Sequence, residues 1–135
     1  MAQIDRVREL CLRYPATEER SSHGEPAWFA GGRKMFAMFA DHHHDDRLAC
    51  WIAAARDDQQ ALVEADPLLW FVPPYVGTRG WVGVYLDTAA TGASGSTGDA
   101  WPQISEVITD GWRIVAGRRL QDRYDELRTE TDPSA

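Results

Sequence analysis

Three consecutive histidines stand between aspartates in the stretch DHHHDD, residues 41–46. Imidazole and carboxylate groups both bind divalent metals, so His42, His43 and His44 are candidate metal ligands. Successive side chains of an extended chain point to opposite sides, however, so three adjacent rings do not converge on one ion. We therefore interpret this stretch as a solvated turn and predict no metal site.

A second group, Ser21, Ser22 and His23, places two hydroxyl nucleophiles beside an imidazole base. Working triads are assembled from separate parts of the chain and also need a group that orients the base. The sequence contains no GxSxG stretch, no GxxxxGK[ST] phosphate loop and no GxGxxG fingerprint. We expect no catalytic residue, no cofactor and a protein that is not an enzyme.

Every basic residue except Lys34 is an arginine, the side chain best suited to bidentate contacts with phosphate. Tyr75 and Trp81 flank Arg79 and supply rings that can stack on nucleic-acid bases. The candidate nucleic-acid-binding residues are Arg33, Lys34, Tyr75, Arg79, Trp81, Arg113, Arg118 and Arg119. An alternative stays open, in which these arginines are ordinary solvated groups, those at 118 and 119 complementing the negative end of the preceding helix dipole.

The net charge of −7 at pH 7 argues against the broad basic surface that drives non-specific nucleic-acid binding. That argument concerns the whole chain and not each face of it. Two classes of partner therefore remain open. One is double-stranded DNA, held through its phosphates, and the other is a protein or small ligand bound by an adaptor that uses an exposed sheet face.

The first half of the chain predicts a helix followed by antiparallel strands. Apolar residues recur at helical spacing over residues 2–14, and Pro15 ends the pattern. Residues 16–26 are polar and contain Gly24 and Pro26, which indicates a loop. The Gly31-Gly32 pair predicts a tight hairpin between strands at 27–30 and 34–40, and a third strand begins at Arg47.

The second half predicts one further strand and three helical segments. A helix over residues 56–66 begins with acidic residues and ends at Pro67, and a strand covers residues 81–87. Small residues indicate a loop over 88–99. A helix follows from Pro102 to about Gly117, and a short charged helix comes after it. This order of elements predicts an α+β domain with its helices packed on one face of the sheet.

A chain of 135 residues that is 44% hydrophobic can bury the core of one domain. Cys11 and Cys50 form no CxxC pair, so we expect both to be buried apolar residues. No apolar run approaches the roughly 18 residues of a membrane helix, and the N-terminal stretch is charged. We expect a cytoplasmic protein without a membrane partner.

The stretches GEPAWFAGGRKMFAMFA and ADPLLWFVPPYVGTRGWVGVYLD resemble the MmcQ/YjbR-like family of small bacterial proteins, over roughly residues 3–120. The matching positions are Gly24, Pro26, Ala27, Lys34, Phe36, Ala37, Pro73, Pro74, Tyr75, Val76, Gly77, Arg79, Gly80, Trp81 and Val82. The resemblance implies a frataxin-like, two-layer α+β fold, in which N- and C-terminal helices cover one face of a curved antiparallel sheet. It also implies DNA binding. We accordingly predict one YjbR-like domain over residues 1–120 and a charged, partly helical or frayed extension over 121–135.

Overall fold

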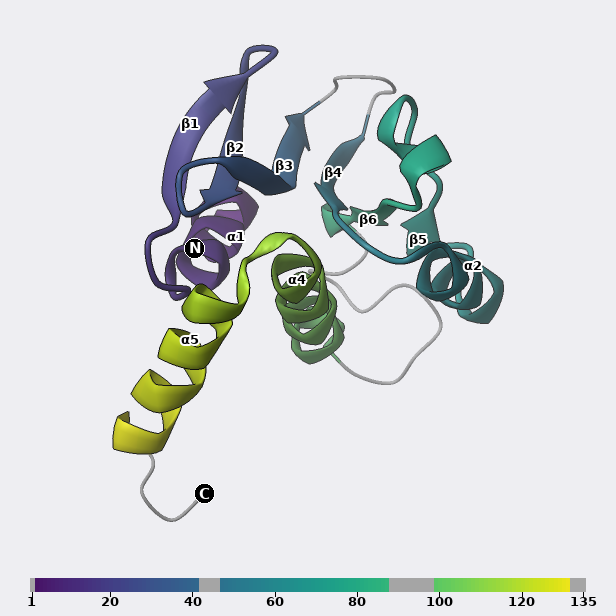
Figure 1. Ribbon diagram of the computed structural model, residues 1–135. Coiled ribbons are helices and arrows are strands. Elements are labelled where there is room, and N and C mark those ends of the chain that lie inside the picture. Colours follow the sequence, from purple (N-terminus) through teal and green to yellow (C-terminus); the bar gives the residue numbers. More distant parts are fainter. Residues whose placement is uncertain (1, 42–46, 88–98, 132–135) are drawn as a thin grey trace.

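The computed structural model describes residues 2–41, 47–87 and 99–131, and these form a curved sheet with helices against it (Figure 1). The sheet has six antiparallel strands in the order β1-β2-β3-β4-β6-β5. The strands are β1 Glu18–Ser22, β2 Glu25–Ala30, β3 Lys34–Asp41, β4 Leu48–Ile52, β5 Trp70–Phe71 and β6 Val82–Tyr85. The predicted α+β class is confirmed.

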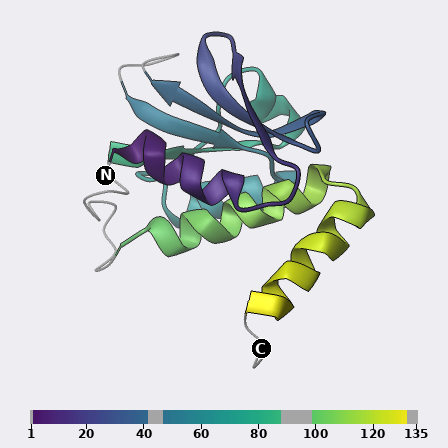
Figure 2. The same ribbon diagram turned by 90° about the vertical axis from the view of Figure 1, so that its left-hand side faces the viewer.

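Helices cover one face of the sheet, and we call the opposite side the open face. The helices are α1 Gln3–Leu12, α2 Arg56–Ala65, α4 Trp101–Val115 and α5 Arg118–Thr131, and a short 3-10 helix, η1, covers Val76–Arg79. Helices α1 and α4 pack against each other and against β3, while α2 lies beside β5. Figure 2 shows α1 and α4 as one layer below the sheet, with α5 leaving that layer at an angle.

The core lies between the sheet and the helix layer, and aromatic rings dominate it. The Tyr14 ring stacks on Trp112 at 4.7 Å between centroids and meets Phe36 edge-on at 5.8 Å. Tyr124 of α5 closes the same cluster, with its ring 5.2 Å from that of Trp112. The predicted boundary at residue 120 therefore falls inside α5, a helix whose Tyr124 packs into the domain core.

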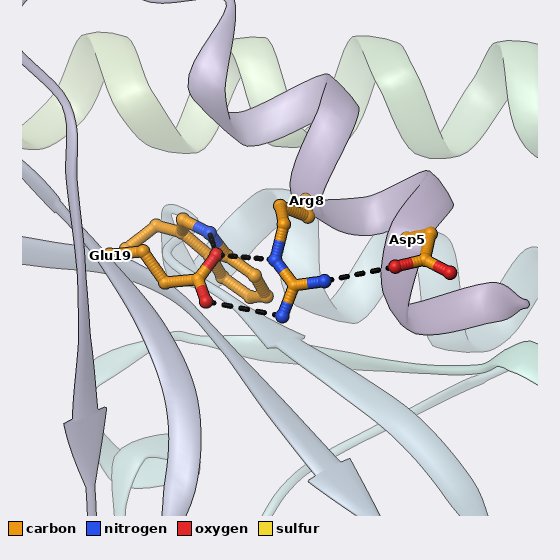
Figure 3. A network of polar contacts seen from close by, with 4 residues as sticks. Asp5, Arg8 and Glu19 are labelled. Carbon is orange, nitrogen blue, oxygen red and sulfur yellow. Dashed lines mark hydrogen bonds and ion pairs between the residues drawn. The ribbon is translucent and has the colours of Figure 1, made fainter.

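A polar network ties α1 to the first strand (Figure 3). The Arg8 guanidinium donates to both carboxylate oxygens of Glu19, at 2.7 and 3.1 Å, and to Asp5 at 2.9 Å. The indole N–H of Trp28 donates to the same Glu19 carboxylate at 2.9 Å. The hydrogen bond from Arg8 is the main reason that the pKa of Glu19 lies below its ordinary value.

Most of the predicted elements are present, but the predicted loop over residues 16–26 is wrong. Residues 18–22 form strand β1, paired with β2 from Glu18–Phe29 to Ser22–Glu25. This strand lies at the sheet edge and is largely exposed, so it carries charged residues instead of an alternating apolar pattern. Two other predictions lie almost entirely outside the described residues: the turn at 41–46, of which 42–46 are not described, and the loop at 88–99, of which 88–98 are not described.

Both cysteines are buried and free, as the sequence predicts. Burial raises the pKa of the Cys50 thiol to about 12 and also raises that of Cys11, so neither is a reactive thiolate at neutral pH. Among the described residues no three His, Cys, Asp or Glu side chains are placed to hold a metal ion. Nor does that part of the chain contain a helix with the length and apolarity to cross a bilayer.

Candidate functional site

The segment from Pro73 to Trp81 connects β5 to β6 and contains a strained turn. The N–H of Val76 donates to the carbonyl oxygen of Pro74 at 2.7 Å, which closes a γ-turn centred on Tyr75. Tyr75 has φ 63° and ψ −70°, the sterically unfavourable form of that turn. Its side chain is 79% exposed, so packing of its ring does not impose this conformation.

Two side chains of helix α2 bind this segment through hydrogen bonds to its backbone. The side-chain amide of Gln59 donates to the carbonyl oxygens of Gly77 and Trp81, at 2.9 and 2.6 Å, and Gln59 is 5% exposed. The Arg56 guanidinium donates to the carbonyl oxygen of Thr78. The two bonds from Gln59 satisfy buried carbonyl groups, and all three bonds fix the segment against the start of α2.

Glycine is required where the segment approaches α2. Gly80 has φ 100°, and a Cβ there would lie 3.0 Å from the carbonyl oxygen of Ala54 and from the N–H nitrogen of Arg56. A side chain at this position would face both an unfavourable backbone conformation and a steric overlap. The GTRG stretch therefore serves close packing, which accounts for its spacing in the sequence.

The clamped segment forms one wall of a cavity of about 460 Å³ on the open face. Its apolar lining comes from Met35 and Met38 of β3, Trp51 of β4, and Val76. Its polar lining comes from Tyr75 and, across the sheet, from Ser22 and His23 at the turn between β1 and β2. We call this cavity the open-face pocket; the β1–β2 turn and η1, which border it, both lie at the upper edge of Figure 1.

A β-bulge places both methionines in the open-face pocket. In a regular strand Met35 and Met38, three residues apart, would point to opposite faces of the sheet. The pairs Trp28–Ala37 and Phe29–Met35 show that β3 has one extra residue opposite β2 at this point. Because Met35 pairs with Phe29 and Met38 pairs with Ala27, which share a face of β2, the bulge turns both methionines to the open face.

The predicted nucleic-acid-binding residues fall into three separate places. Arg33 and Lys34 are exposed at the β2–β3 turn, and Arg118 and Arg119 are exposed at the start of α5. A Cβ on Gly31 would lie 3.3 Å from the Cδ1 atom of Leu120, which brings that turn next to the first turn of α5. We call this surface, Arg33, Lys34, Arg118 and Arg119, the basic end.

The remaining predicted residues do not join the basic end. Arg79 is the last residue of η1, and Tyr75 directly precedes this helix. The Arg79 guanidinium lies 5.9 Å from the centre of the Trp81 ring. Trp81 is 5% exposed and belongs to the core, so its ring is not accessible for stacking on a base. Arg113 makes an ion pair of 2.9 Å with Asp125, and this hydrogen bond raises the pKa of Arg113.

The four cations of the basic end make no ion pair or side-chain hydrogen bond with the described residues, whereas other arginines do. The pairs are Arg6–Asp99, Arg8–Glu19, Arg47–Asp87, Arg113–Asp125 and Arg123–Glu126. Arg118 and Arg119 open α5, so they lie at the positive end of that helix dipole as well as beyond the end of α4. The four cations of the basic end therefore have no direct carboxylate partner in the described part of the chain, while the Glu18 carboxylate lies beside Gly32 of the same turn.

Sequence reasoning singled out Ser22, His23 and Tyr75 for other roles but missed the floor of the open-face pocket that they border. The strand patterns predict only that Met35, Met38 and Trp51 are in strands with buried side chains. The bulge that turns both methionines to the open face has no signature in a single sequence. Gln59 lies in the polar run DDQQ, where nothing distinguishes it from the exposed Gln60. Its partners are eighteen and twenty-two residues away in the chain, so their contact depends on the tertiary fold.

Comparisons with known proteins agree with the motifs of the sequence. Residues 12–114 match the model of the YjbR family. The crystal structure of the Deinococcus radiodurans protein DR2400, of domain family DUF419, is similar to this chain with a TM-score of 0.68 and 15% sequence identity, over 93% of this chain and 89% of that one. At that identity the similarity concerns the fold alone. No curated protein matches the sequence. Since the family model spans most of its length, the chain belongs to the YjbR family.

Proposed function

We propose that this protein is a non-catalytic module that binds double-stranded DNA, with the basic end contacting phosphates. The observation that supports the proposal is the gathering of Arg33, Lys34, Arg118 and Arg119 at one end of the domain, exposed and without an ion-pair partner among the residues that the structure describes. Uncompensated arginines gain most from a phosphate, because guanidinium and phosphate form short, bidentate, charge-assisted hydrogen bonds. An arginine already paired with a carboxylate would first have to lose that partner.

Two further features of the basic end favour an anion. Arg118 and Arg119 lie in the first turn of α5, where backbone N–H groups lack partners within the helix and the dipole attracts negative charge. Arg20 adds a cation nearby, since its guanidinium donates to the carbonyl oxygen of Gly32 in the β2–β3 turn at 2.9 Å. The acids Asp122 and Glu126 follow along α5, so the phosphate contacts would be confined to its first turn.

The expected binding is salt-sensitive and weakly dependent on DNA sequence. Phosphate contacts position a protein on DNA, while base contacts specify the site. The one predicted aromatic residue that is fully accessible, Tyr75, lies on the η1 segment and not at the basic end. With four cations, the slope of log affinity against log salt would be about −3 to −4. The net charge of −7 limits detectable binding to low salt.

Fluorescence anisotropy of a labelled short DNA duplex, titrated at several KCl concentrations, tests the proposal. The variant Arg118→Gln/Arg119→Gln should reduce the salt slope by about two. The matched control Arg6→Gln/Arg47→Gln removes the same charge from two arginines that are paired with Asp99 and Asp87. It should leave the slope nearly unchanged. Absence of binding at low salt, or equal slopes for the two variants, would refute the proposal.

A further inference from the structure

The open-face pocket has the size and enclosure of a site for a small molecule. Its volume of about 460 Å³ lies within the range of roughly 300–1,000 Å³ that such sites occupy. Met38 and Trp51 in its floor are only 3% and 4% exposed, so each offers a ligand a small part of its surface at the base of the pocket. A flat protein surface cannot contact such a floor, whereas a compact molecule can enter and cover it.

The lining indicates the chemistry of that molecule. The floor presents the thioethers of Met35 and Met38, the ring of Trp51 and the aliphatic side chain of Val76, and among the described residues no Asp, Glu, Lys or Arg lines the cavity. Methionine sulfur and indole rings both make favourable contacts with aromatic rings, and unbranched methionine adapts to their shape. The floor therefore suits an uncharged aromatic ring.

Polar groups are confined to the mouth. His23 and Tyr75, on opposite sides of it, are both exposed, and Ser22 lies beside His23. Their hydroxyl and imidazole groups can hydrogen-bond one polar substituent of a ligand whose ring is buried. This division, an apolar floor with a few polar groups at the rim, is typical of small-molecule sites.

The mouth is also held in place by strained backbone. His23 and Tyr75 have φ values of 54° and 63°, a region that residues other than glycine seldom adopt. Such conformations persist only where the surrounding structure imposes them, and they concentrate at binding sites. Here the bonds from Gln59 fix the segment after Tyr75. A pocket whose walls are already ordered binds a ligand without the entropic cost of ordering them.

We propose that the open-face pocket binds a small, uncharged aromatic molecule that carries one polar group. Its ring lies on Trp51 between the two methionine side chains, and its polar group faces His23 and Tyr75 at the mouth. This site lies on the open face, and its ligand does not need the basic end. The inference therefore stands apart from DNA binding.

The three methionines of the chain provide a direct test, with indole as the probe. Protein labelled with ¹³C at the methionine methyl groups gives one NMR signal each for Met1, Met35 and Met38. Titration with indole should shift the signals of Met35 and Met38 in a saturable way, through the ring current of the bound probe.

Variants locate the binding site and separate it from the basic end. Tyr75→Ala removes an exposed ring at the mouth and should weaken indole binding about fivefold or more. Leu68→Ala removes another exposed hydrophobic side chain, outside the pocket, and should bind as the wild type. Circular dichroism confirms that both variants fold. The Arg118→Gln/Arg119→Gln variant should also bind indole as the wild type.

Three results would overturn the inference. The first is the absence of saturable shifts at Met35 and Met38 with millimolar indole. The second is equal indole affinity of the Tyr75→Ala and Leu68→Ala variants, which would place the probe elsewhere. The third is equal affinity for cyclohexanol, a polar aliphatic molecule of similar size, which would exclude selectivity for an aromatic ring.

Discussion

The side-chain Nε2 atom of Gln59 lies 2.9 Å from the carbonyl oxygen of Gly77 and joins α2 to the segment that walls the open-face pocket. The same amide donates to the carbonyl oxygen of Trp81 at 2.6 Å. One buried side chain therefore satisfies two backbone carbonyl groups of a segment that has no strand or long helix of its own. The position of that segment depends on α2 as much as on its own prolines and glycines.

Replacing Gln59 by Leu should destabilise the protein by about 1–3 kcal/mol. The substitution keeps a stem of similar size but removes one donor from each of two buried carbonyl oxygen atoms, of which that of Gly77 keeps the N–H of Gly80. Urea denaturation followed by tryptophan fluorescence measures the free energy of unfolding. The control is Gln60→Leu at the exposed neighbouring position, where a change within about 0.5 kcal/mol is expected. Equal effects of the two variants would show that the hydrogen bonds of Gln59 contribute little.

The strained γ-turn at Tyr75 predicts an inverted order of stability between glycine and alanine. In most positions alanine is more stable than glycine because it loses less backbone entropy on folding. At φ 63° alanine would keep the steric strain and glycine would not. The free energy of unfolding of Tyr75→Gly should therefore be higher than that of Tyr75→Ala by about 1 kcal/mol.

The matched control for Tyr75 is Ile114, an exposed residue inside α4 with ordinary helical geometry. There Ile114→Ala should be more stable than Ile114→Gly by about 1 kcal/mol. Thermal and urea unfolding of the four variants measures both differences. The same order at both positions would contradict the presence of strain at Tyr75.

Local patterns in the sequence predict the elements whose burial is regular. Apolar residues at helical spacing identify α1 and α4, and the Gly31-Gly32 pair identifies the hairpin between β2 and β3. The strand β1 escapes this reasoning because its sequence, EERSS, lies at the sheet edge with most side chains in solvent. An edge strand in solvent needs no alternation of apolar and polar residues, so its sequence lacks the pattern that identifies a strand. Its pairing with β2 is what makes this segment a strand.

The two surfaces of interest depend on contacts between distant residues, and the sequence therefore predicts them only in part. The arginines of the basic end are visible as residues, but their proximity depends on Gly31 lying beside Leu120 of α5. Whether an arginine has a carboxylate partner is likewise a property of the fold. Trp81 has the residue type of a stacking platform, yet the core buries it.

The contact between Glu19 and Arg8 predicts a pH dependence of stability. The pKa of the Glu19 carboxyl is lowered in the folded protein, chiefly by the hydrogen bond from Arg8. Ionised Glu19 therefore stabilises the fold at pH values above its unfolded pKa, and this stabilisation is lost as the pH falls through the lowered folded value. The loss should occur in the acid range below about pH 4.5, the ordinary value for this group.

The variant Glu19→Gln cannot ionise and should show a flatter dependence of stability on pH in this acid range. Its stability should be below that of the wild type at pH 7 and approach it toward pH 3. Glu18→Gln, one residue earlier on β1 and without an ion pair among the described residues, should keep the wild-type dependence. Urea titrations at several pH values measure these curves, and parallel curves for wild type and Glu19→Gln would contradict the prediction.

Gly111 lies in the middle of α4, where glycine weakens a helix by about 1 kcal/mol relative to alanine. A Cβ at this position would lie 2.3 Å from the carbonyl oxygen of Ala53, at the end of β4, and 3.0 Å from the Cγ2 atom of Ile52. Glycine is therefore the residue that lets α4 approach the sheet closely. We expect Gly111→Ala to destabilise the fold by about 2 kcal/mol or more, because the overlap is with backbone and outweighs the gain in helix propensity.

The comparison for Gly111 is Gly117, where an added Cβ has no atom within 4 Å. Gly117→Ala should change stability by less than about 1 kcal/mol, since it affects only the start of α5. Urea denaturation of both variants measures stability, and near-ultraviolet circular dichroism, to which all six tryptophans contribute, measures packing of the aromatic core. A Gly111→Ala variant as stable as Gly117→Ala would mean that α4 can move away from the sheet at little cost, contrary to the tight contact with Ala53.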